Sequence, residues 1–151
     1  MVKEAVNLMN ENIQKNGYTV VGVMQGEDTP SFAYTVGLLE TYNHPELIAF
    51  GLPVNTVSAL FRNVVEGIIE NQVIIQAHIP YEQIANMPIE FINADTNKAS
   101  AYMIGFINKY GNSRELKAMQ LLWSDKQGFF PYEKEFDVAF LNSQPLLGKI
   151  V

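Results

Sequence analysis

The sequence predicts an α+β domain in which a mixed, mostly antiparallel sheet of five to six strands packs against about three helices. Helical and strand-like runs alternate along the chain, and the early strands follow one another through short turns. Short connections favour antiparallel pairing. No internal repeat or linker divides the 151 residues, so we expect a single domain over 1–151. A small split barrel is the alternative architecture.

The N-terminal third predicts one helix and three strands. Apolar residues fall at steps of four, three and four over residues 2–15, which is typical of a helical stripe: Val2, Val6, Met9 and Ile13. Gly17 suits the left-handed position that ends a helix. We expect strands at 18–24, 31–38 and 46–51, with a turn at 26–30. The runs 31–38 and 46–51 should be adjacent antiparallel strands, and the second should be central.

The middle of the chain predicts a core helix. Pro53 suits the opening of this helix, and Asn71 follows its last residue, Glu70. Its expected apolar face consists of Val57, Leu60, Phe61, Val64, Val65, Ile68 and Ile69.

The second half predicts three further strands, at 73–79, 89–94 and 118–123, and one helix over 98–110. Asn97 could cap that helix and Gly111 should end it. Its buried stripe should consist of Tyr102, Met103, Phe106, Ile107 and Tyr110. Residues 124–128 form a predicted turn, and the apolar tail 144–148 should dock against the domain.

Composition excludes several function classes. The chain has no cysteine, which excludes disulfides, thiolate zinc sites and cysteine nucleophiles. The net charge is −6, and the ten Lys and Arg residues are scattered, which disfavours nucleic-acid binding. No apolar run approaches the ~18 residues of a membrane span, and the N-terminus lacks an apolar signal region. We therefore expect a cytoplasmic protein that does not bind membranes.

Motifs for metals, phosphates and serine nucleophiles are missing from the sequence. The two histidines, His44 and His78, do not form an i, i+4 pair, so we expect no metal site. The sequence contains neither a glycine-rich phosphate loop nor a G-x-S-x-G elbow. We expect no cofactor, and phosphoryl transfer and serine hydrolysis are disfavoured.

The run His44-Pro-Glu46 is the first candidate site, because it could place an imidazole and a carboxylate at one cleft. The alternative is a turn in which Pro45 fixes the backbone, His44 bonds a carbonyl and Glu46 is solvated. Tyr34 and Thr35 fall on opposite faces of the predicted strand. Tyr34 could be a core residue with a bonded hydroxyl. Gly37 could mark a bulge or a close backbone approach, which either a ligand or the curvature of the sheet could require.

Trp123 and Asp125 form the second candidate site, at the end of a predicted strand. Asp125 with Gly128 suits an ordinary turn, but Trp123 could also form the wall of a pocket. Residues at strand ends and turns are free of core packing. We therefore predict that His44, Glu46, Trp123 and Asp125 cluster around one cleft.

These segments together resemble a bacterial family known as domain of unknown function 4262. The resemblance rests on the ordered runs Tyr34-Thr-Val-Gly-Leu38, His44-Pro-Glu-Leu47, Gly51-Leu52, Trp123-Ser-Asp125 with Gly128, Phe130-Pro131 and Gln144-Pro-Leu-Leu-Gly148. The family usually has tryptophan where this chain has Tyr18, and tends toward tryptophan and aspartate at Tyr132 and Glu133. The resemblance implies a small stand-alone domain and carries no reaction.

Three functions are consistent with these patterns. The leading interpretation is a binding domain that holds a small molecule near the 34–46 hairpin, with Tyr34, Thr35, His44, Glu46, Trp123 and Asp125 as ligand-binding residues. The second is a protein-interaction module of inhibitor, antitoxin or immunity type, whose partner is a protein. The third is a hydrolase-like enzyme that uses His44 with a carboxylate. The sequence assigns no catalytic residue and no oligomeric state.

Overall fold

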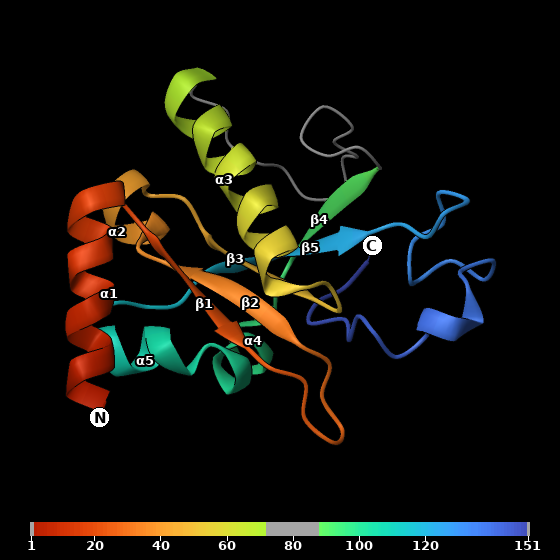
Figure 1. Cartoon of the computed structure of the whole chain (residues 1–151), viewed down its shortest axis with the longest axis horizontal. Coiled ribbons are helices and arrows are strands. Elements are labelled where there is room, and N and C mark those ends of the chain that lie inside the picture. Colours follow the sequence, from red (N-terminus) through yellow and green to blue (C-terminus); the bar gives the residue numbers. More distant parts are fainter. Residues whose placement is uncertain (1, 72–87, 151) are drawn as a thin grey trace.

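The computed structural model describes residues 2–71 and 88–150, which form a five-stranded sheet in the order β1-β2-β3-β5-β4 (Figure 1). The strands are β1 (Thr19–Val23), β2 (Phe32–Val36), β3 (Glu46–Phe50), β4 (Ile89–Asn93) and β5 (Ala118–Trp123). In this part of the chain three neighbouring pairs are antiparallel, and β3 pairs with β5 in parallel. The predicted α+β class is therefore confirmed, and β3 is central as expected.

Helices cover both faces of the sheet (Figure 1). They are α1 (Val2–Asn16), α2 (Leu38–Tyr42), α3 (Val54–Asn71), α4 (Thr96–Tyr102) and α5 (Ile104–Tyr110), with a 3₁₀ turn η1 (Val138–Phe140) near the C-terminus. On one face α3 packs its buried residues Val57, Phe61 and Val64. On the other face α1, α4 and α5 pack Met9, Ala99 and Phe106. Every residue of β2, β3 and β5 is consequently buried.

The turn between β2 and β3 contains a helix that the sequence did not reveal. The predicted strand 31–38 ends at Val36, and Gly37, whose φ of 118° favours glycine, is the N-cap of α2. Gly37 forms no bulge, but the close backbone approach that was the alternative is confirmed, because an added Cβ would lie 3.0 Å from the Gly17 carbonyl oxygen. The two runs still form adjacent antiparallel strands, with Phe32 opposite Phe50, as predicted.

The helix expected over 98–110 is broken into two. Asp95, not Asn97, is its N-cap, and its carboxylate accepts a hydrogen bond from the Lys98 N–H at 3.1 Å. The break lies at Met103, where ψ is 57°. The N–H of Gly105 then donates to the Tyr34 hydroxyl at 2.8 Å. A long-range hydrogen bond thus stabilises a kink that local periodicity cannot reveal.

Other elements agree with expectation, with small corrections. The tail is docked, because the Gln144 side chain accepts from the Trp123 N–H and donates to the Trp123 carbonyl, each at 3.0 Å. Ile69 and Ile107 are exposed rather than buried, since each lies at the margin of its helical stripe. The strand expected at 73–79 lies outside the described residues.

The buried face of α3 gives a stability prediction. Phe61→Ala should lower the free energy of unfolding by about 3–5 kcal/mol, because Phe61 is fully buried. Ile69→Ala on the same helix is the control, with an expected loss under about 1 kcal/mol, because Ile69 is 53% exposed. Urea unfolding of both variants measures the difference. Equal losses would show that α3 packs through another face.

Candidate functional site

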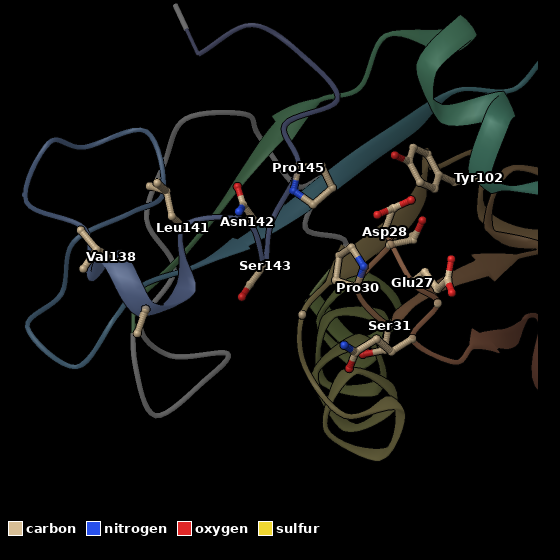
Figure 2. A pocket seen from close by; sticks show the side chains of 15 residues that line it. Glu27, Asp28, Pro30, Ser31, Tyr102, Val138, Leu141, Asn142, Ser143 and Pro145 are labelled. Atoms are coloured by element: carbon tan, nitrogen blue, oxygen red, sulfur yellow. The ribbon is translucent and has the colours of Figure 1, made fainter.

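A cleft of about 710 Å³ lies between two segments that are far apart in sequence (Figure 2). One wall comes from residues 25–31, which connect β1 to β2. The other wall comes from residues 138–145, in and after η1. Gly51 and Tyr102 complete the lining. The Tyr102 ring is held edge-on against Phe32 and Phe50, with ring centroids 5.4 and 5.0 Å apart.

Backbone hydrogen bonds shape the first wall. We call it the acidic wall because it carries Glu27 and Asp28. The N–H of Gly26 donates to the Thr29 carbonyl at 2.9 Å, which closes the turn. The Gly51 N–H donates to the Ser31 carbonyl at 2.8 Å and ties the wall to the end of β3. Both carboxylate side chains are exposed to solvent. None of the described residues that line the cleft is Lys, Arg or His.

The second wall, which we call the apolar wall, presents Val138 and Leu141 to solvent. These side chains are 82% and 59% exposed. In Figure 2 they lie across the cleft from Glu27 and Asp28. The wall approaches the sheet closely at Gly51, where φ is 81° and an added Cβ would lie 2.7 Å from the Ser143 carbonyl oxygen. Only glycine fits this position without moving the wall.

Trp123 and Asp125 hold the apolar wall in place. The Trp123 indole N–H donates to the Phe50 carbonyl at 2.7 Å, and its ring lies 6.0 Å from that of Phe140. Asp125 accepts from the N–H groups of Phe129 and Asp137, each at 2.9 Å. Partial desolvation raises the pKa of Asp125, but the backbone hydrogen bonds outweigh it and hold that pKa below its ordinary value. Both side chains are buried, so they support the wall from behind.

His44 and Glu46 lie at the other end of the sheet. Glu46 pairs with Ala118 at the start of β5, and β3 runs parallel to β5. Trp123 is the last residue of β5, so it lies roughly 16 Å from Ala118 along the strand. The predicted single cleft formed by His44, Glu46, Trp123 and Asp125 is therefore wrong. The turn that contains His44 precedes β3, whereas the turn that contains Asp125 follows β5. Because β3 and β5 run in parallel, the two turns lie at opposite ends of the sheet.

The Glu46 carboxylate accepts four hydrogen bonds in the interior. The Thr35 hydroxyl donates to Oε1 at 2.7 Å, and the backbone N–H groups of residues 37–39 donate at 2.9–3.3 Å. Glu46 thereby satisfies the first N–H groups of α2. Burial raises its pKa from 4.5 to about 7, because desolvation of the carboxylate outweighs these four bonds, which lower it. The alternative in which Glu46 is solvated is wrong.

The other candidates of the 34–46 hairpin are also buried. His44 is 3% exposed, and its Nδ1 lies 2.8 Å from the Pro45 carbonyl oxygen. Burial lowers the pKa of His44, and the hydrogen bond to Pro45 offsets part of this effect. Tyr34 packs in the core with its hydroxyl bonded to Gly105, as its core interpretation expected. Thr35 bonds Glu46 from the opposite face of β2.

Sequence reasoning identified neither wall of the cleft as a site. Gly26-Glu-Asp-Thr-Pro30 was interpreted only as a turn, although two adjacent carboxylates in a hairpin loop were a usable signal. The tail was expected to dock, but nothing local indicated that it would face residues 25–31. More than one hundred residues separate the two walls.

Residues 2–71 and 88–150 contain neither a metal-binding cluster nor a membrane-spanning helix. No group of three or more His, Asp or Glu side chains in this part of the chain is arranged to hold a metal ion. Among the same residues, no helix is both long enough and apolar enough to cross a membrane.

The sequence matches one protein family, described as "Domain of unknown function (DUF4262)", over residues 12–137. The match includes the acidic wall and most of the segments that carried the resemblance. It leaves out the run Gln144–Gly148, which also supported that resemblance, and the apolar wall. No curated protein and no solved structure matches the chain.

The Thr35–Glu46 contact gives a second stability prediction. Thr35→Val should lower the free energy of unfolding by about 1–3 kcal/mol, because it removes a donor to Glu46 and the acceptor of the Leu47 N–H at 2.9 Å. Thr56→Val, at an exposed position of α3, is the matched control. Denaturant unfolding measures both. An equal effect of the two changes would show that the buried contact contributes nothing.

The raised pKa of Glu46 predicts a pH dependence of stability. Between about pH 4.5 and 7 the unfolded chain loses the Glu46 proton before the folded chain does, so the free energy of unfolding should fall as the pH rises through this window. The expected fall is up to about 3 kcal/mol, levelling off above about pH 7. Urea unfolding from pH 5 to 8 measures it. Glu46→Gln should flatten the slope, whereas Glu135→Gln, at an exposed position, should retain it.

Proposed function

The chain belongs to the DUF4262 family, whose description assigns no activity, and from the geometry of its cleft we propose that it is a binding domain for positively charged ligands. One observation carries this proposal. The cleft of about 710 Å³ has two carboxylates on one wall and, among the described residues that line it, no basic side chain to neutralise them. A ligand with ammonium or guanidinium groups fits this lining, and an anionic ligand does not.

The size and place of the cleft support the proposal. Clefts of ~300–1,000 Å³ are typical of small-molecule sites. This cleft lies beyond the carboxyl end of β3, because Gly51 directly follows that strand. The parallel strands β3 and β5 both finish at this end, and the cleft is lined by connecting segments, which commonly carry binding residues. The net charge of −6 also favours the approach of cations over anions.

The three functions drawn from the sequence differ in how well the geometry supports them. Small-molecule binding fits the cleft better than the 34–46 hairpin, because Tyr34, Thr35, His44 and Glu46 are all buried. A hydrolase-like enzyme needs His44 at an accessible cleft, which its 3% exposure does not favour. A protein-interaction module is consistent with the same cleft if the charged ligand is part of another protein.

The experiment is a titration with spermidine, a flexible trivalent amine, at low ionic strength. Binding can be followed by the fluorescence of Trp123, the one tryptophan of the chain, which lies behind the apolar wall. The double change Glu27→Gln and Asp28→Asn should weaken binding about five- to thirty-fold, since each exposed carboxylate–ammonium contact contributes about 0.5–1 kcal/mol. Added salt should weaken binding of the unaltered protein as well.

The control is the double change Glu11→Gln and Glu115→Gln, which removes the same two charges at exposed positions that do not line the cleft. It should leave spermidine affinity within about two-fold of the unaltered protein. If spermidine does not bind, or if both double variants weaken binding equally, the cleft is not the site of cation binding and the proposal fails.

A further inference from the structure

We infer that the ligand of the cleft is a basic peptide segment in which positively charged residues alternate with apolar ones, with the charges facing the acidic wall and the apolar side chains facing the apolar wall. This inference rests on the proposed function and specifies its ligand. It follows from the different chemistry of the two walls and of the polar groups between them.

Charge alone does not account for the apolar wall. Val138 and Leu141 are 82% and 59% exposed, so each has apolar surface that a ligand can cover. They lie on the side of the cleft opposite the carboxylates (Figure 2). A ligand that covers them removes apolar surface from water, which adds affinity that a polyamine with only short methylene spacers uses poorly.

The remaining lining suits a peptide backbone. Gln25 and Asn142, which both carry a side-chain amide, line the cleft from opposite walls. An amide group both donates and accepts hydrogen bonds, as the N–H and C=O groups of a peptide require. A volume of about 710 Å³ has room for more than one side chain. A basic and apolar peptide therefore matches the carboxylates, the apolar surface and the amides together.

The position of the apolar wall is fixed independently of any ligand. Asp125 bonds the Asp137 N–H just before the wall, and Gln144 bonds both backbone groups of Trp123 near its end. Changes at the exposed Val138 and Leu141 leave these anchors intact. Substitution there can therefore test ligand recognition with the fold preserved, and the melting temperature checks this.

The experiment compares two blocked peptides of equal charge, acetyl-Lys-Leu-Lys-Leu-amide and acetyl-Lys-Ser-Lys-Ser-amide, with spermidine as a third probe. Isothermal titration calorimetry and Trp123 fluorescence measure the affinities. The leucine peptide should bind about ten-fold more tightly than the serine peptide. The double change Val138→Ser and Leu141→Ser should reduce the ratio of the two peptide affinities from about ten-fold to about one. Leu8→Ser, at an exposed position of α1, should leave the preference intact.

The outcomes separate the two proposals. If spermidine and both peptides bind with equal dependence on Glu27 and Asp28, but leucine gives no gain, the inference fails and the proposed function stands. If the preference for leucine survives the changes at Val138 and Leu141, the inference also fails, because the apolar contact lies elsewhere. If no probe binds the unaltered protein, both fail.

Discussion

The buried carboxylate of Glu46 is the interaction on which the arrangement of the sheet depends. It belongs to β3, yet it bonds the hydroxyl of Thr35 in β2 and the first N–H groups of α2. Thr35 in turn accepts the N–H of Leu47, so the two strands and the helix between them share one closed network. A carboxylate buried without these donors would be very unfavourable. The network therefore favours one geometry for the β2–α2–β3 unit.

The parallel pairing of β3 with β5 divides the molecule into two functional ends. The end that contains Glu46 and His44 is filled with buried polar groups that bond the protein itself. At the other end, where both strands finish, the chain leaves a cleft lined by exposed charges and apolar side chains. The end that contains Glu46 thus holds a buried polar network, whereas at the cleft end the carboxylates of Glu27 and Asp28 face solvent.

The sequence predicted elements that local patterns encode and missed features that depend on distant contacts. The helices α1 and α3 and the strand β5 lie where their periodicity places them. The helix α2 was missed because five residues carry too little periodicity and its N–H groups are satisfied by Glu46, which lies later in the chain. The kink at Met103 depends on Tyr34, seventy-one residues from Gly105. His44 and Glu46 looked like site residues because their chemistry was visible while their burial was not.

The two walls of the cleft come from opposite halves of the sequence, and this has a consequence for folding. More than one hundred residues separate residues 25–31 from residues 138–145, so bringing them together costs loop-closure entropy that only the complete fold offsets. Partly folded chains in which the tail is not docked therefore have only one of the two walls of the cleft. Any ligand of the cleft binds the native state alone and shifts the folding equilibrium by mass action. Occupancy of the cleft therefore raises the free energy of unfolding of the whole domain.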